Sequence, residues 1–284
     1  KLKAQRTMID YSIRKYPRTP HLEGSRLQAG DEDINRIPFC EIAGEHIVLE
    51  EKCDGANCGV SFDGDGTLLL QSREHYLTGG YSERHYALFK QWANVHRDAF
   101  YQVLGARYIL YGEWLYAKHT VYYNDLPHYF LEFDVFDRDT GLFLDTANRR
   151  ALLSTLPVQS VPVLTQGTFS STTELMGYLG PSRYIRQPHI ESLRQYCTET
   201  GLDAQKYCAE TDASPLMEGL YIKVEADGAV NRRMKFVRAS YLQGIADDDT
   251  AWLQRPIIPN RLRYPMEAIF APQLPHNDEE NTNA

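Results

Sequence analysis

The stretch Glu51-Lys52-Cys53-Asp54-Gly55-Ala56-Asn57 at residues 51–57 follows an apolar run at residues 46–49. The run predicts a short strand with the lysine at its end. A lysine in this position, followed at once by an aspartate and a glycine, indicates chemistry rather than a solvated surface. Free lysine, with a pKa of about 10.4, is almost wholly protonated at neutral pH, so a nucleophilic lysine needs surroundings that disfavour its charge.

Two later segments support the same interpretation. They are Glu218-Gly219-Leu220-Tyr221-Ile222-Lys223 and Arg233-Met234-Lys235-Phe236-Val237-Arg238, and each has the pattern of a strand with charge at one end. We expect Lys223, Arg233 and Lys235 to face one pocket with Lys52 and to repel its proton. The same cations would hold a nucleotide phosphate and stabilise the charge that grows in its transition state.

The composition excludes several classes of protein. The 284 residues are 43% hydrophobic and 24% charged, as is ordinary for a chain with one large core. No apolar run approaches the roughly 20 residues of a membrane span, so we expect no membrane partner. The five cysteines are odd in number and form no CxxC pair, which disfavours a disulfide framework or structural zinc site and fits a cytoplasmic protein. The net charge of −8 means that any contact with nucleic acid needs a local cationic face.

The order of expected elements predicts an α+β fold, with an antiparallel sheet core and peripheral helices. A meander of three strands is expected at 46–52, 57–62 and 67–72, with later strands at 108–116 and 129–136 and a final hairpin of 218–225 with 230–239. Helices are expected at 81–104, at 146–156 after the N-cap Asp145, after the capping box at 171–174, and at 189–200 and 203–210.

Together, these segments resemble the covalent nucleotidyltransferase superfamily of ATP-dependent RNA and DNA ligases and mRNA capping enzymes, and within it the RNA ligases that seal nicks. The matching motifs are Lys52-Cys53-Asp54-Gly55, Ser72-Arg73, Gly112-Glu113-Trp114-Leu115, Glu132-Phe133-Asp134-Val135-Phe136, residues 218–223 and residues 233–235. Each motif alone is weak, but their order across residues 52–235 is specific. Two positions depart from the pattern: Arg233 stands where many relatives carry lysine, and Tyr221 lies near the place of a small aliphatic residue.

The resemblance implies an ATP-grasp-like ligase adenylation core and an ATP-dependent RNA ligase. Lys52 would carry AMP taken from ATP and pass it to a 5′-phosphate, which is then joined to a 3′-OH in RNA repair. Lys223 and Lys235 would be catalytic beside Lys52, and Phe133 would stack on adenine. Mg²⁺ or Mn²⁺ would be held through waters by Asp54, Glu113 and Glu218. The implied nucleotide-binding residues are Glu51, Asp54, Gly55, Asn57, Arg73, Glu113, Phe133, Glu218, Tyr221, Lys223, Arg233 and Lys235.

The resemblance also implies the partners and domains. RNA with 5′-phosphate and 3′-OH ends is the expected substrate, and both a nicked duplex and a separate end-healing kinase or phosphatase are compatible with it. We expect an N-terminal extension at residues 1–45 that packs on the core, and a nucleotidyltransferase domain at 46–240 with a helical insertion at about 171–215. A short C-terminal segment at 241–284 would end in a disordered acidic tail.

Alternatives remain at each level. Glu113 and Glu218, taken singly, would be ordinary strand carboxylates, and Phe133 could equally be core packing. A DNA ligase or capping-type enzyme is disfavoured, because the residues after Arg238 are too few and too rich in proline for an OB domain. A nucleotide-binding module without catalysis is disfavoured by the intact Lys52. Within the helical insertion, Arg183, Arg186, His189 and Arg194 form either a basic face for RNA or a solvated helix surface.

Overall fold

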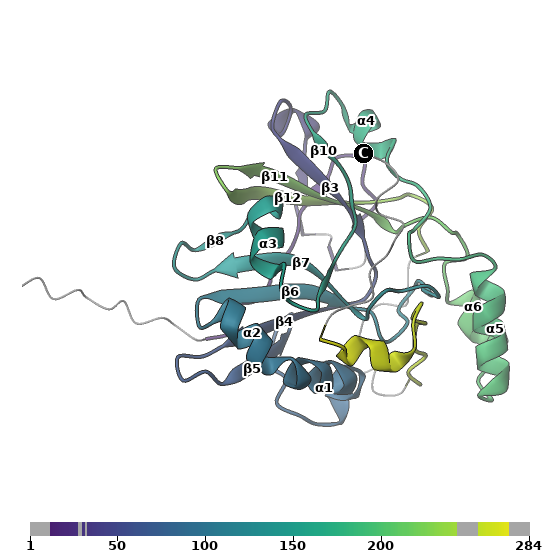
Figure 1. The fold of residues 1–284 in the computed structure, drawn as a ribbon. Helices are drawn as coiled ribbons and strands as arrows, with labels where there is room; N and C mark the ends of the chain where they lie inside the picture. The colour runs from purple at the N-terminus through teal and green to yellow at the C-terminus, as the bar shows by residue number, and fades with distance from the viewer. Residues whose placement is uncertain (1–11, 28–29, 32, 243–254, 273–284) are drawn as a thin grey trace, which may run out of the picture.

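Two six-stranded sheets, each assembled from strands distant in the sequence, form the centre of the fold (Figure 1). The computed structural model describes residues 12–27, 30–31, 33–242 and 255–272. In Figure 1 the first sheet lies in the upper half and the second in the lower half, with helices around them. This arrangement confirms the predicted α+β class and its largely antiparallel core.

The first sheet carries the start of the stretch at residues 51–57, because Glu51 and Lys52 end β3. Its strand order is β10 (Val163–Gly167), β3 (Ile47–Lys52), β11 (Gly219–Ala226), β12 (Ala229–Val237), β1 (His21–Leu22) and β2 (Arg36–Ile37). Strands β10, β3, β11 and β12 pair antiparallel, whereas β1 is parallel to both of its neighbours. The register sets Gly219 opposite Lys52, so the glutamate that precedes β11 comes next to the lysine.

The second sheet carries the other carboxylates. Its order is β5 (Leu68–Ser72), β4 (Ala56–Phe62), β6 (Tyr108–Trp114), β7 (Phe130–Asp137) and β8 (Leu142–Phe143), and β9 (Gln159–Ser160) pairs in parallel with β7. The predicted meander at 46–72 is wrong in part, because β4 pairs with β5 but β3 belongs to the first sheet. Gly55 makes this crossing possible. A Cβ there would lie 2.7 Å from Cδ2 of Leu115 and 2.8 Å from the carbonyl oxygen of Trp114.

Most predicted helices are present, with adjusted ends. The helical elements are η1 (Phe39–Glu41), η2 (Tyr81–Tyr86), α1 (Ala87–Val95), α2 (Arg97–Leu104), α3 (Thr146–Leu153), α4 (Thr172–Met176), α5 (His189–Glu199), α6 (Ala204–Ala209) and η3 (Met266–Phe270). The helix expected at 81–104 is divided into η2, α1 and α2. Asp145 caps α3 as predicted, since its Oδ1 accepts from the amide of Asn148. No described helix has the length and apolar character to span a bilayer.

The capping box at residues 171–174 is confirmed in one half only. Oγ of Ser171 accepts from the amide of Glu174, but the Glu174 carboxylate accepts from Ser170 rather than from Ser171. The resulting helix α4 is five residues long. Helices α5 and α6 pack on each other at one side of the sheets (Figure 1).

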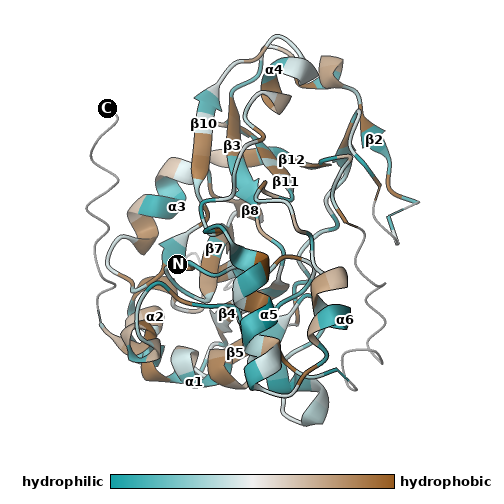
Figure 2. Ribbon diagram, turned by 90° about the vertical axis from the view of Figure 1, so that its right-hand side faces the viewer, coloured by the Kyte–Doolittle hydropathy of each residue, from teal (hydrophilic) through white to brown (hydrophobic). Residues whose placement is uncertain are grey.

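The two sheets contribute to separate apolar clusters. Residues of β4, β6, β7, α1 and α2 form the larger cluster, and alternate residues of β3 and β11, including Leu49 and Ile222, form a second. The apolar character of β3 and β7 is plain in Figure 2. The opposite face of β3 presents Glu50 and Lys52, so the space between the sheets is charged.

That charged layer contains three carboxylates and three cations in contact. The ion pairs are Arg149–Glu50 at 2.6 Å, Arg149–Glu132 at 3.1 Å, Lys223–Glu50 at 2.9 Å, Lys223–Asp134 at 3.1 Å and Arg233–Asp134 at 3.5 Å. Five of the six side chains are at most 1% exposed. Because buried charges are tolerated only when they are paired, the network ties the two sheets together.

The predicted division of the chain at residues 45 and 240 stays a prediction. Within the predicted N-terminal extension, β1 and β2 pair at the edge of the first sheet. Residues 1–11 of that extension and the predicted disordered acidic tail at 273–284 lie outside the described residues.

Candidate active site

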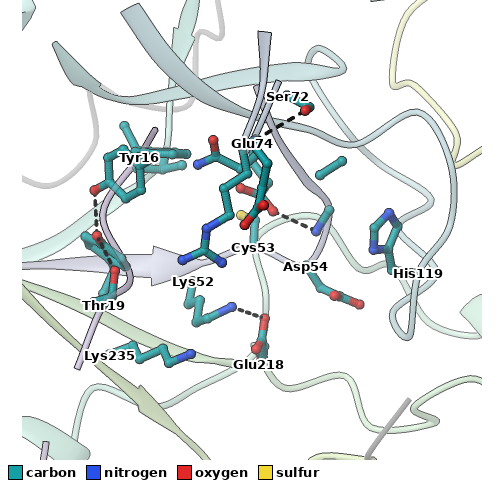
Figure 3. A pocket seen from close by; sticks show the side chains of 18 of the residues that line it. Tyr16, Thr19, Lys52, Cys53, Asp54, Ser72, Glu74, His119, Glu218 and Lys235 are labelled. Carbon is teal, nitrogen blue, oxygen red and sulfur yellow. Dashed lines mark hydrogen bonds and ion pairs between the residues drawn. The ribbon is translucent and has the colours of Figure 1, made fainter. Parts of the chain in front are cut away.

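A cavity of about 790 Å³ opens where the ends of β3 and β11 meet β4 and β6 (Figure 3). Eleven of the residues singled out from the sequence line it: Glu51, Lys52, Asp54, Gly55, Asn57, Arg73, Glu113, Phe133, Glu218, Tyr221 and Lys235. Lys223 and Arg233 are not among the lining residues. Motifs up to 183 residues apart in the sequence (235 − 52) therefore meet at one site.

Carboxylates, rather than cations, dominate the surroundings of Lys52. Its Nζ lies 2.7 Å from Oε2 of Glu218, a side chain that is 1% exposed, while Lys52 itself is 20% exposed. Burial opposes the charge on Lys52, but the nearby carboxylates of Glu218, Glu113 and Asp54 outweigh it and raise the pKa of the amine above its usual range. The expected depression of this pKa by neighbouring cations is therefore not what this arrangement produces.

Glu113 and Asp54 are held by backbone amides beside the lysine. Oε1 of Glu113 accepts from the amide of Gly55 at 3.0 Å. Burial, with the negative charges of Asp54 and Glu218, raises the pKa of Glu113 to about 8, although Lys52 acts in the opposite direction. Oδ2 of Asp54 accepts from the amides of Thr120 and Val121 at 2.7 and 2.8 Å. Glu113 is thus able to keep a proton at neutral pH, whereas one oxygen of Asp54 is already engaged.

The three carboxylates fit a hydrated cation better than a directly ligated one. Among residues 12–27, 30–31, 33–242 and 255–272, no three His, Cys, Asp or Glu side chains are grouped to hold a metal ion. Mg²⁺ retains several waters and usually takes only one or two protein carboxylates. Burial is the main cause of the raised pKa of Glu113, and a hydrated divalent cation would relieve the repulsion that Asp54 and Glu218 add to it.

Lys235 reaches the cavity from β12 and is paired with an acid that the sequence interpretation missed. Its Nζ donates to Oδ2 of Asp31, which also lies 3.1 Å from Nε2 of His21. The parallel pairing of β1 with β12 sets His21 opposite Lys235. Burial and the nearby charge of Lys52 lower the pKa of Lys235, while Asp31 partly offsets them. No local pattern links residues 31 and 235, so this pair depends on the tertiary fold.

Phe133 and Tyr221 form an aromatic wall of the cavity. Their ring centroids are 6.3 Å apart and the ring planes are inclined by 35°. The Tyr221 hydroxyl lies 2.6 Å from the Tyr16 hydroxyl and 3.1 Å from Oγ1 of Thr19. Phe133 also packs edge-on against Tyr16 at 5.1 Å. Phe133 therefore both lines the cavity and packs in the core.

Lys223 and Arg233 lie behind this wall and do not line the cavity. Lys223 is 1% exposed, pairs with Glu50 and Asp134, and donates to the carbonyl oxygen of Phe133. Arg233 lies over the ring of Phe143, with Cζ 3.9 Å from its centroid, and beside Asp134. The sequence suggested that both side chains contact a phosphate directly. Their positions behind the cavity wall do not fit that role.

Glu51 and the helical insertion also differ from expectation. The buried Glu51 carboxylate accepts from the amide of Arg183 at 3.2 Å and from Oγ of Ser182, and burial raises its pKa to about 6. His189 is fully buried, Arg186 pairs with Asp125 at 2.8 Å and Arg194 pairs with Glu191 at 3.3 Å. Arg186 and Arg194, each about half exposed and paired with an acid, fit the solvated-helix alternative, whereas the buried His189 belongs to neither kind of surface.

Several lining residues were not singled out from the sequence. They are Tyr16, Thr19, Glu50, Glu74, His75, Ser82, Glu83, His85, Tyr86, His119 and Val161, while Cys53, Ala56 and Ser72, which also line the cavity, lie within the stretches quoted from the sequence. His119 lies beside Asp54 in Figure 3. A lone histidine in a loop carries no signal of this placement in the sequence.

Comparison with known proteins places the chain in a family. Residues 45–237 match the family model described as RNA ligase. The chain is also similar to solved structures of a Naegleria gruberi RNA ligase. A variant with ATP and Mn is 19% identical (72% of this chain, 52% of that chain, TM-score 0.47). A second variant with AMP and Mn is 18% identical (71% and 52%, TM-score 0.48), and a structure with PPi is 21% identical (71% and 52%, TM-score 0.47).

The chain spans about half the length of these solved structures. A search of curated proteins found no match.

Proposed function

The chain belongs to the RNA ligase family, and from that premise we propose that it is an ATP-dependent RNA ligase working through AMP bound covalently to Lys52. The observation that carries the proposal is the position of Lys52. Its amine lies 2.7 Å from Glu218 in a cavity that Glu113 and Lys235 also line. All four residues fall within the matched range 45–237.

In the first proposed step, Nζ of Lys52 attacks the α-phosphorus of ATP. A nitrogen–phosphorus bond forms, the bond to the bridging oxygen breaks, and pyrophosphate leaves with the electron pair. The amine must lose a proton as this happens. Glu218 is placed to accept it, and burial raises its pKa, which makes it a better base than a free carboxylate.

The raised pKa of Lys52 makes its deprotonation the demanding part of this step. We propose that Asp54, Glu113 and Glu218 hold Mg²⁺ or Mn²⁺ through waters. A bound divalent cation would offset the negative potential of the carboxylates at Lys52 and so favour the neutral amine.

Lys235 and the aromatic wall would bind the nucleotide. Lys235 lines the cavity and would stabilise charge on the α-phosphate, while its amine also donates to Asp31. Phe133 would stack on adenine, with Tyr221 beside it. For Lys223 we propose an indirect part, because its amine holds the backbone carbonyl of Phe133. Asn57 and Arg73 would contact ribose and phosphates, Glu51 and Gly55 would complete the nucleotide site, and Arg233 would support the wall through Asp134.

Two transfers complete the proposed reaction. An oxygen of the RNA 5′-phosphate attacks the AMP phosphorus, the nitrogen–phosphorus bond breaks, and Lys52 recovers its amine. The 3′-OH of the second end then attacks the 5′-phosphorus, and AMP leaves as the phosphodiester forms. RNA repair in the cytoplasm is the setting we propose, and the five unpaired cysteines support a reducing compartment.

Incubation with ATP labelled at the α-phosphate tests this proposal. The protein should form a covalent adduct that is labile in acid and stable in alkali, and Lys52→Ala should form none. Lys206→Ala, which alters an exposed lysine of α6, is the matched control and should label normally. Absence of an adduct on the intact chain would favour the non-catalytic alternative.

Two further comparisons separate the enzymatic alternatives. Labelling by GTP rather than ATP would favour a capping-type enzyme. Nicked duplexes with RNA or DNA on the 3′-OH side decide between RNA and DNA ligation, and we expect sealing to require RNA.

A further inference from the structure

The loop of residues 115–123, between β6 and β7, forms hydrogen bonds with both the side chain and the backbone of Asp54. The amides of Thr120 and Val121 donate to Oδ2 of Asp54 at 2.7 and 2.8 Å. In the reverse direction, the amide of Asp54 donates to the Tyr123 hydroxyl at 2.8 Å. Since Asp54 is two residues from Lys52, this loop sets the direction of the chain just past the candidate nucleophile.

A single side chain from the C-terminal part closes that loop. Nδ2 of Asn260 donates to the carbonyl oxygen of Leu115 at 2.8 Å, and Oδ1 accepts from the amide of Tyr123 at 2.9 Å. Leu115 and Tyr123 are the two ends of the loop, so one amide joins them. Asn260 is 1% exposed, and its backbone is engaged too, because its amide donates to Tyr116 and its carbonyl accepts from the Tyr129 hydroxyl, both at 2.8 Å.

The residues around Asn260 follow the same loop. The amide of Lys118 donates to the carbonyl of Ile258 at 2.8 Å, and the amide of Arg261 donates to the carbonyl of Tyr123 at 2.9 Å. Bridges pair Ala117 with Pro259 and Leu126 with Leu262. Residues 258–262, which we term the C-terminal strap, therefore run along the loop; they precede η3 in the yellow segment of Figure 1.

We propose that Asn260 is a positioning residue for the adenylylation site, acting on Asp54 through the loop of residues 115–123. This inference rests on the proposed function, because it concerns the rate at which Lys52 is adenylylated. Loss of the Asn260 side chain would leave the carbonyl of Leu115 and the amide of Tyr123 buried without partners, and the loop would open. Asp54 would then lose its fixed orientation, and with it the arrangement of carboxylates around Lys52. The strap lies within the predicted C-terminal segment at 241–284 and bonds to residues of the predicted nucleotidyltransferase domain.

Three variants of the full chain test the inference. Asn260→Ala removes the closure, and Tyr123→Phe removes only the hydroxyl that accepts from Asp54 while keeping the buried ring. Asn124→Ala is the matched control, since Asn124 also bonds a backbone carbonyl and amide, both of Arg186, at 2.8 and 2.7 Å. Single-turnover adduct formation is measured against ATP and Mg²⁺ concentration, and hydrogen exchange is followed in peptides covering residues 115–124 and β12.

We expect Asn260→Ala and Tyr123→Phe to slow adduct formation by about 10- to 100-fold, as is typical for residues that orient catalytic groups, and to raise the Mg²⁺ concentration at half-maximal rate. Exchange should accelerate at residues 115–124 in Asn260→Ala and stay unchanged in β12. Asn124→Ala should match the unmodified chain in rate and in Mg²⁺ dependence.

The outcomes separate the two proposals. If the unmodified chain forms no adduct, the proposed function fails. If it does form one, while folded Asn260→Ala and Tyr123→Phe keep its rate and Mg²⁺ dependence, the positioning role of Asn260 is refuted. If Asn260→Ala does not fold, Tyr123→Phe decides the matter, because a normal rate in that variant refutes the path through Asp54.

Discussion

Replacement of Arg149 by leucine tests the buried charge network most severely. Arg149 is fully buried in α3 and pairs with Glu50 of β3 at 2.6 Å and with Glu132 of β7 at 3.1 Å. Among the described ion pairs, Arg149 is the cation that contacts both carboxylates, and the substitution removes it. Both would stay in the layer between the sheets, and Glu50 would keep only Lys223 as an ionic partner among the described pairs.

The expected cost follows from that geometry. Breaking a buried pair by removing one partner typically costs about 3–5 kcal/mol, because an uncompensated charge stays behind. Folded proteins of ordinary stability have about 5–15 kcal/mol in total, so the variant should be severely weakened. The melting temperature should fall by on the order of 10 °C.

Denaturant unfolding of the intact chain and of Arg149→Leu measures this cost. The matched control is Arg232→Leu, because Arg232 pairs with Glu41 at 3.4 Å with both side chains about half exposed. Exposed pairs contribute about 0–1 kcal/mol, so the control should unfold almost normally. A loss below about 1 kcal/mol in Arg149→Leu would show that the network does not join the sheets as described.

Three further predictions concern the cavity. Because the folded pKa of Glu113, at about 8, lies above the unfolded value near 4.5, the folded state binds the extra proton between those values. Stability should therefore fall as pH rises from about 4.5 to 8, and Glu113→Gln should flatten that fall in unfolding measurements made across the range. Lys235→Ala should lower the rate of adduct formation by about 100-fold or more at saturating ATP, and a near-normal rate would remove Lys235 from the phosphate site. Tyr221→Val removes the hydroxyl bonded to Tyr16 and Thr19 and one ring of the wall, so it should raise the ATP concentration for half-maximal adduct formation by about tenfold. An unchanged concentration would show that the ring does not contact the nucleotide.

The sequence predicted the meeting of Lys52 with Glu113 and Glu218 because each residue stands in a short motif at a strand end. It also predicted most strands, since alternation and turn residues are local signals. The sheet to which each strand belongs was harder to predict. Strands β3 and β4 are separated by three residues (53–55), yet they lie in different sheets, and the close approach at Gly55 that permits this is a tertiary contact.

The roles of individual cations were the least predictable. Lys223 and Lys235 both alternate with apolar neighbours, as in any half-buried strand, so the pattern does not show what covers either side chain. Lys223 meets Asp134 of the other sheet, and Lys235 meets Asp31 of the N-terminal part. The hydrogen bonds of Asn260 to residues 115 and 123 likewise could not be predicted from the sequence, because they join groups more than 130 residues apart (260 − 123 = 137).

Mapping the modified residue tests the central claim most directly. After incubation with ATP and Mg²⁺, the protein is digested at alkaline pH, where the adduct is stable. The peptide with an AMP-sized mass increase is then sequenced by mass spectrometry. The modification should be on the side-chain nitrogen of Lys52. An AMP group on any other residue, or an unmodified Lys52 in a protein that still joins RNA ends, would contradict the assignment.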